Sequence, residues 1–210
     1  MDVAYLVTVL VVILISMTLH EAMHGFMAYW LGDDTAKMEG RLTLNPLKHI
    51  DPFMTILLPI MLALIKAPIF GGAKPVPFNP ARVRGEEWGA ALVALAGPLT
   101  NFLLAFAGYG LFVLVLPKEG SLLYTFLTTH IGVNLGFFVF NMLPIPPLDG
   151  SRVLYALAPD FVRRGMEAIE RYGTLLVFAI VILAGGLVGS FMSVAIGFIV
   201  HLFAAIFNVR

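Results

Sequence analysis

The chain contains no cysteine among its 210 residues. A sequence without cysteine cannot form disulfides, ligate iron–sulfur clusters or hold zinc through thiolates. Any zinc site in this protein must therefore be built from histidine and carboxylate side chains. The absence of cysteine carries no information about the redox compartment.

Charged residues are also scarce. Lys, Arg, Asp and Glu make up 12% of the sequence, whereas soluble domains carry about 25%. Hydrophobic residues make up 60%, and the mean hydropathy is +0.93. Thirteen basic and thirteen acidic residues cancel, which gives no support for a nucleic-acid partner. The composition predicts a single integral membrane domain over residues 1–210, in contact with membrane lipid.

Long apolar segments predict an all-α polytopic membrane protein with about five to six transmembrane helices. The first helix should run from about Val3 to Leu31 and end at Gly32. Further apolar segments cover 88–116, which Gly97 and Pro98 should interrupt, and 122–143, 173–184 and 187–207. Residues 159–172 are polar on one side and suit the membrane interface. We expect a core of about 3–155 and closing helices at about 160–210.

The connection between the first two long helices is harder to place. Residues 53–65 are apolar but contain Pro59 and number only 13, which fits a re-entrant or tilted segment as well as a crossing. Residues 73–80 must be extended, because each proline pushes its predecessor out of the helical region. Residues 41–44 alternate and could form a short strand. We therefore expect a re-entrant or extended element, or a β-hairpin.

The basic residues favour the re-entrant path. If residues 53–65 do not cross, twelve of the thirteen Lys and Arg residues lie on one side and Lys118 lies opposite. If they cross, the division becomes nine against four. The positive-inside rule favours the first arrangement and puts the Asp149 side in the cytoplasm. The predicted location is the cell membrane, with several crossings.

A metal-binding pattern lies near the end of the first helix. His20 and His24 are four residues apart, so their rings share one helix face. Glu21 sits about 100° round the helix, as the general base does in the His-Glu-x-x-His pattern of zinc hydrolases. No charged residue occurs from Val3 to Met17, and ionisable groups at membrane depth are tolerated mainly for function. The alternative is a set of polar side chains snorkelling at a helix end.

A catalytic zinc ion needs three protein ligands and one open position. The remaining histidines and the carboxylates near apolar segments are all candidates for the third ligand. Asp149 stands out because it follows a proline-rich break at 144–147, and unwound backbone at membrane depth must line a cavity or pack against protein. Asp149 and Gly150 also fit an ordinary turn. His49 lies in a polar loop, where we expect it to be exposed. Asn101 has no metal affinity, and we expect it to satisfy freed backbone nearby or to contact the helix that bears the histidines.

Three stretches together carry a family resemblance. They are His-Glu-Ala-Met-His at 20–24, Ala-Gly-Pro-Leu-Thr-Asn-Phe at 96–102 and Asn-Met-Leu-Pro-Ile-Pro-Pro-Leu-Asp-Gly at 141–150. In this order, each on its own apolar segment, they resemble the site-2 protease family of intramembrane zinc metalloproteases. The resemblance implies that His20, His24 and Asp149 bind Zn²⁺, that Glu21 is the general base, and that the substrate is a transmembrane protein or peptide.

The resemblance also implies substrate contacts. Asn141 would help hold the substrate or the oxyanion, and the extended stretch with Lys74, Val76 and Asn79 would present an edge to the substrate backbone. Between two prolines, the N–H of Val76 is one of the few groups that we expect to be available for such pairing. A plain interfacial loop is the alternative interpretation of this stretch.

Two other functions fit parts of the pattern. A membrane zinc carrier would place exchangeable ligands along a path and would not need Glu21. An inactive relative would bind transmembrane helices without cutting them, and the intact Glu21 argues against it. The chain resembles a minimal family form. The short turn at 117–120 leaves no room for the PDZ domain of one branch, and the sequence stops at Arg210 where another branch appends a nucleotide-sensing domain after the last helix. The sequence leaves the oligomeric state open.

Overall fold

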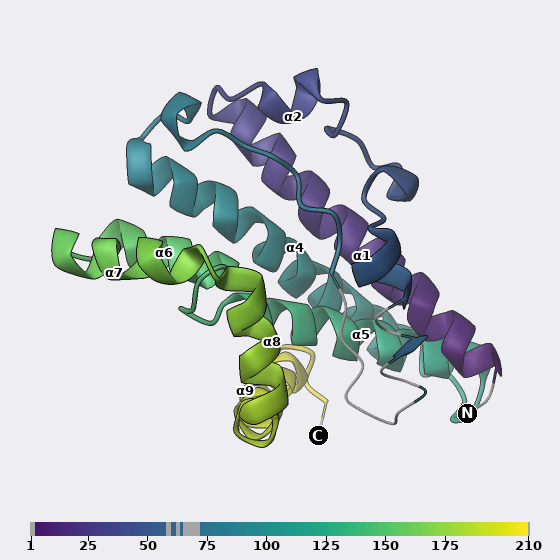
Figure 1. Ribbon diagram of the computed structural model, residues 1–210. Helices are drawn as coiled ribbons and strands as arrows, with labels where there is room; N and C mark the ends of the chain where they lie inside the picture. Colours follow the sequence, from purple (N-terminus) through teal and green to yellow (C-terminus); the bar gives the residue numbers. More distant parts are fainter. Residues whose placement is uncertain (1–2, 58–59, 62–63, 65–71, 210) are drawn as a thin grey trace.

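The computed structural model describes residues 3–57, 60–61, 64 and 72–209 (Figure 1). The described residues contain helices and irregular segments but no strand, so the short strand considered at 41–44 is absent. The all-α class is confirmed. In chain order the elements are α1 (Val3–Trp30), α2 (Thr35–Met38), η1 (Pro46–Lys48), η2 (Pro52–Leu57), η3 (Pro80–Arg82), α4 (Glu86–Val115), α5 (Leu122–Asn141), α6 (Asp149–Leu157), α7 (Asp160–Glu170), α8 (Gly173–Leu183) and α9 (Gly185–Ile206).

Helix α1 ends where the sequence predicts. Gly32 adopts a φ of +107°, which L-residues with a side chain rarely adopt. The N–H of Gly32 donates to the carbonyl of Tyr29, and the N–H of Asp33 donates to that of Ala28. This pair of bonds is the Schellman motif, which satisfies carbonyls that the end of a helix leaves free.

Four helices in the described part of the chain, α1, α4, α5 and α9, are long and apolar enough to cross a membrane. The protein is therefore a multi-pass membrane protein. Helix α8 is apolar but has only 11 residues, whereas a crossing needs about 20. The described helices thus supply fewer full-length spans than the five to six that we expect from the sequence.

Helix α4 lies at the centre of the helix bundle and packs against α1, α5 and α6 (Figure 1). Its buried face consists largely of glycine and alanine, which lets neighbouring helix backbones approach closely. The expected interruption at Gly97 and Pro98 is wrong, because α4 continues through both residues. A proline costs a membrane helix one hydrogen bond, which neighbouring groups can compensate. Helix α9 covers α5, and its fully buried Phe203 packs on Ala105 and Leu135.

The segment between α1 and α4 starts and finishes at the same end of α1. The guanidinium of Arg82 lies 2.8 Å from a carboxylate oxygen of Asp34, and the N–H of Arg84 donates to the carbonyl of Leu31. Residues 72–79 form no helix or turn, and the backbone of Asn79 is extended. The predicted extended stretch 73–80 is therefore wrong at its last residue, because Pro80 begins η3. Residues 58–59, 62–63 and 65 of the 53–65 stretch lie outside the described residues, so its re-entrant path stays a prediction.

Candidate metal centre

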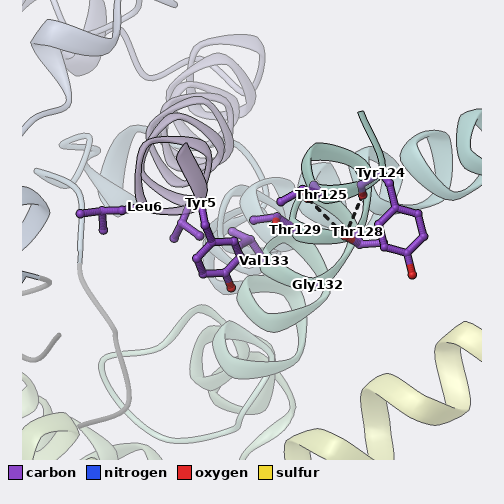
Figure 2. A pocket seen from close by; sticks show the side chains of 9 residues that line it. Tyr5, Leu6, Tyr124, Thr125, Thr128, Thr129, Gly132 and Val133 are labelled. Atoms are coloured by element: carbon purple, nitrogen blue, oxygen red, sulfur yellow. Dashed lines mark hydrogen bonds between the residues drawn. The ribbon is translucent and has the colours of Figure 1, made fainter. Parts of the chain in front are cut away.

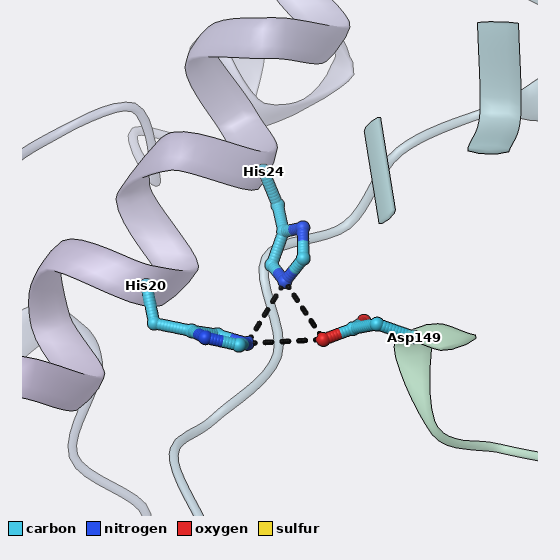
Figure 3. Close-up of side chains that lie close together, drawn as sticks. All are labelled: His20, His24 and Asp149. Carbon is cyan, nitrogen blue, oxygen red and sulfur yellow. Dashed lines mark hydrogen bonds and ion pairs between the residues drawn. The ribbon is translucent and has the colours of Figure 1, made fainter. Parts of the chain in front are cut away.

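Helices α1 and α6 bring two imidazoles and one carboxylate together (Figure 3). The Nε2 atoms of His20 and His24 are 3.0 Å apart, and Asp149 Oδ2 lies 3.2 Å from the first and 3.5 Å from the second. The histidines are only 7% and 8% exposed. Asp149 is the first residue of α6, so the proline-rich break does turn its side chain inward. The three residues predicted from the sequence thus meet at one point.

The outer nitrogens of both rings have acceptors. His20 Nδ1 lies 2.6 Å from Asn101 Oδ1, and His24 Nδ1 lies 2.7 Å from the carbonyl oxygen of Val93. Carbonyl oxygens only accept, so each Nδ1 carries the hydrogen and each neutral ring presents a lone pair at Nε2. At these distances the two nitrogens and the carboxylate oxygen need a positive charge between them, which a proton or a metal ion can supply. The donor set therefore fits zinc, which prefers imidazole and carboxylate ligands whose outer atoms are hydrogen-bonded.

Asn101 belongs to a buried polar network across three helices. Its Nδ2 donates to Asn134 Oδ1 on α5 at 2.9 Å, and Asn134 Nδ2 donates to Ser16 Oγ on α1 at 2.9 Å. Asn101, Asn134 and Ser16 are each fully buried. These bonds fix the orientation of the Asn101 amide, so that its oxygen faces His20. The expected contact of Asn101 with the helix that bears the histidines is confirmed.

Two glycines allow neighbouring segments to pack closely at the site. Gly97 lets α4 approach the histidines of α1, and Gly150 lets α6 approach the end of α5. We did not predict either role from the sequence. A Cβ at Gly97 would collide with the rings of both His20 and His24. A Cβ at Gly150 would collide with the carbonyl of Met142, so Gly150 lets α6 start against the end of α5. Both glycines lie inside the stretches that carry the family resemblance, and that position is the sequence feature that could have indicated their roles.

Glu21 contacts the extended residues 72–79, which we call the strap. The N–H of Val76 donates to Glu21 Oε2 at 2.9 Å, and the Val76 side chain is buried. The expectation that the Val76 N–H is available for a substrate is therefore wrong in this conformation, because Glu21 already accepts it. The strap lies against α1 at the residue that follows His20.

The other residues predicted to bind substrate make no hydrogen bond to the metal ligands within the described residues. Asn141 Nδ2 donates to the Phe137 carbonyl on its own helix, and Asn79 Oδ1 accepts from the N–H of Ala81 in a helical cap. The Lys74 side chain is exposed, while its N–H donates to the carbonyl of His49. Substrate binding by these residues stays a prediction. His49 itself is buried, not exposed as expected. The strap is bonded to it, since the N–H of Lys74 donates to its carbonyl, and its Nε2 donates to the carbonyl of Thr43.

A separate cavity of about 600 Å³ lies between the first turns of α1 and α5 (Figure 2). Tyr5, Leu6 and Val9 line it from α1, and threonines 125, 128 and 129 line it from α5. At about 1.5 Å per residue, Val9 lies about 17 Å along the helix from His20. This cavity is therefore not part of the metal centre.

The fold and the site define a class of membrane proteins with a histidine–carboxylate metal centre. The family model described as Peptidase family M50 matches residues 115–184. The protein named "Putative zinc metalloprotease YwhC" of Bacillus subtilis is 41% identical over 213 residues, which cover 97% of this chain and 93% of that protein. The chain therefore belongs to peptidase family M50, the site-2 protease family, and is a zinc metalloprotease.

Other relatives agree with this placement. The protein named "Putative zinc metalloprotease Rip2" of Mycobacterium tuberculosis is 30% identical over 187 residues, which cover 86% of this chain and 68% of that protein. "Stage IV sporulation protein FB" of Bacillus subtilis is 37% identical over 89 residues, which cover 42% of this chain and 28% of that protein. No solved structure matches the chain at a comparable level.

Proposed function

We propose that this zinc metalloprotease is an intramembrane endopeptidase that cleaves transmembrane segments of other membrane proteins. His20, His24 and Asp149 would hold the zinc, and Glu21 would act as the general base. The observation that carries the proposal is the convergence of two imidazole nitrogens from the apolar helix α1 and one carboxylate oxygen from α6. Ionisable groups at membrane depth are costly and mark functional sites.

The chemistry divides between the metal and the side chains. When bound, zinc acts as a Lewis acid that makes water a nucleophile near neutral pH. Glu21 would accept the proton of the attacking water and pass it to the leaving amine. Asn101 and the carbonyl of Val93 hold the two imidazoles with Nε2 toward the centre. Gly97 leaves room for both rings.

A substrate helix must unwind before it can be cut, because its scissile carbonyl is hydrogen-bonded within the helix. Asn141 would hold the unwound segment or the oxyanion, and the strap residues Lys74 and Asn79 would lie along it. We further propose a single protease domain over residues 1–210, with its catalytic core at about 3–155 and the Asp149 side in the cytoplasm. The excess of basic residues on that side supports the orientation.

Cleavage of a purified single-span substrate in lipid nanodiscs tests the proposal. Wild-type protein should cut inside the span, and Glu21→Gln should keep zinc and lose turnover. Glu39→Gln, at an exposed position, is the matched control and should cut normally. Cleavage by Glu21→Gln at the wild-type rate would remove Glu21 as the base. Zinc transport into liposomes by wild type, without any cleavage, would favour the carrier.

A further inference from the structure

We propose that the strap is a positioning element for Glu21. The N–H of Val76 orients the Glu21 carboxylate, and Arg41 fixes the strap in the place where it can do so. The inference rests on the proposed role of Glu21 as general base, and it assigns positioning roles to two residues outside the metal ligands. Val76 thereby changes from an expected substrate contact to a support of the catalytic machinery.

The contact with Glu21 is specific. The Val76 N–H donates to Oε2 at 2.9 Å, and within the described residues no other hydrogen bond reaches this carboxylate. A glutamate side chain has three rotatable bonds, so without this donor its carboxylate would sample several rotamers. With Oε2 fixed, the other oxygen keeps its lone pairs for a proton. A general base works only when it is held within hydrogen-bond reach of the proton that it abstracts.

Arg41 holds the strap just before Val76. Its Nη2 donates to the carbonyl of Lys74 at 2.7 Å and lies 3.3 Å from that of Pro75. Arg41 is 7% exposed, and in the described part of the chain no carboxylate lies within ion-pair distance of it. A buried guanidinium is costly to desolvate, and its direct hydrogen bonds here are to strap carbonyls. The buried guanidinium of Arg41 therefore holds the strap in place through these two carbonyls.

Further contacts fix the strap on either side. The N–H of Lys74 donates to the carbonyl of His49, and the N–H of Asn79 donates to Asp33 Oδ2 at 2.5 Å. The Val76 side chain packs closely on α1, since a Cβ at Gly25 would lie 3.0 Å from Val76 Cγ1. The two backbone bonds, from Lys74 and from Asn79, do not depend on the side chain at residue 76, so they still hold the Val76 N–H opposite Glu21 when that side chain is changed.

The neighbouring prolines limit the strap to one donor at this point. Pro75 and Pro77 have no N–H, and they also keep Val76 extended. A side-chain truncation at residue 76 therefore leaves the donor in place, and only proline removes it. Val76→Ala and Val76→Pro thus form a matched pair, because both lose the valine side chain and only the second loses the N–H.

Steady-state kinetics in nanodiscs separate the possible roles of the strap. We expect Val76→Pro to lower kcat roughly 10- to 100-fold, the size of effect that a misplaced catalytic group produces, with KM and zinc content unchanged. The loss should be equal for a stable substrate helix and for one with Gly-Pro near the cut. Val76→Ala should retain most of kcat, and Arg41→Gln should lower kcat without raising KM. Arg82→Gln, which alters an exposed ion pair with Asp34, is the control and should be neutral.

Two kinetic outcomes would overturn the proposal. A rise in KM confined to the stable substrate helix would make the Val76 N–H a substrate-binding group and not a support of Glu21. An equal loss of kcat in Val76→Ala and Val76→Pro would show that the side chain, and not the N–H, is responsible.

Hydrogen exchange tests the contact without any cleavage. In full-length, zinc-loaded protein, the Val76 amide should exchange roughly 10-fold faster or more in Glu21→Ala than in wild type, as expected for the loss of a bond to a charged acceptor. The Lys74 amide, which donates to His49, is the internal control and should not change. An unchanged Val76 amide would overturn the proposal. If wild type cut no substrate, the proposed function would fail while this exchange result could still stand.

Discussion

Asn101 accepts a hydrogen bond from His20 across the interface of α4 and α1, with 2.6 Å between Oδ1 and Nδ1. The bond joins a residue without metal affinity to a predicted metal ligand, and it fixes the ring so that Nε2 faces His24 and Asp149. Because Asn101 is itself held by Asn134, the geometry of the metal centre depends on the packing of three helices.

Asn101→Leu should weaken zinc binding about 10- to 100-fold, the usual cost of losing an outer-shell partner. The leucine fills similar space but leaves His20 Nδ1 without an acceptor. Competition with a zinc chelator measures the affinity. Thr100→Val is the control, since among the described residues the Thr100 hydroxyl bonds only to the Ala96 carbonyl on its own helix. Equal affinity in Asn101→Leu and wild type would mean that the bond does not support the metal centre.

Gly97→Ala should reduce zinc content and activity together, because the added methyl group would enter the space of both imidazoles. Gly132→Ala is the matched control, since no described atom beyond the adjacent helix backbone lies within 4 Å of the place that its Cβ would occupy. Zinc analysis of the two purified variants gives the comparison. Full zinc occupancy and activity in Gly97→Ala would show that α4 can shift away from the rings at little cost.

Asp33, just beyond the end of α1, should make the stability of the protein depend on pH. Burial alone would raise the pKa of its carboxyl, but hydrogen bonds from the Thr35 hydroxyl and from the N–H groups of Asn79 and Thr35 hold that pKa below its usual range, as does the charge of Arg82. A folded-state pKa below the unfolded one stabilises the protein above the unfolded value, about 3.9. This stabilisation is lost as the pH falls through the folded value.

Asp33→Asn should therefore destabilise the protein by about 1.5–3 kcal/mol at pH 7, and the difference should shrink as the pH falls below about 4. Unfolding in detergent at several pH values measures it. Asp160→Asn, at an exposed position, should have little effect at any pH. A difference that is constant from pH 7 to pH 3 would contradict the ionised state of Asp33.

The path between α1 and α4 is open to cysteine labelling, because the chain has no cysteine of its own. Met38→Cys and Ala81→Cys, both at exposed positions, should react with an impermeant reagent from the cytoplasmic side. Lys118→Cys should react from the other side. Labelling of residues 38 and 81 from opposite sides would mean that the segment crosses the membrane.

The sequence predicts the parts of this protein that depend on local patterns. The extent of α1 follows from its apolar run and from the stop at Gly32. The meeting of His20 and His24 follows from helix geometry. Asp149 could be singled out because the proline-rich break before it unwinds backbone at membrane depth, and such backbone must line a cavity or pack against protein.

Contacts between distant segments could not be predicted in the same way. The clash that a side chain at Gly97 would cause depends on how closely α4 approaches α1. The burial of His49 and the bond from Val76 to Glu21 depend on where the strap lies, and no periodicity encodes that position. The expected break at Pro98 failed because neighbouring helices support α4 through it.

Zinc analysis of single variants tests the central assignment most directly. Wild type and Glu21→Gln should each bind one zinc ion per chain, whereas His20→Ala, His24→Ala and Asp149→Ala should each lose most of it, because catalytic zinc takes three protein ligands. The account predicts this division between the base and the ligands. Stoichiometric zinc in Asp149→Ala at wild-type affinity would remove Asp149 from the ligand set and contradict it.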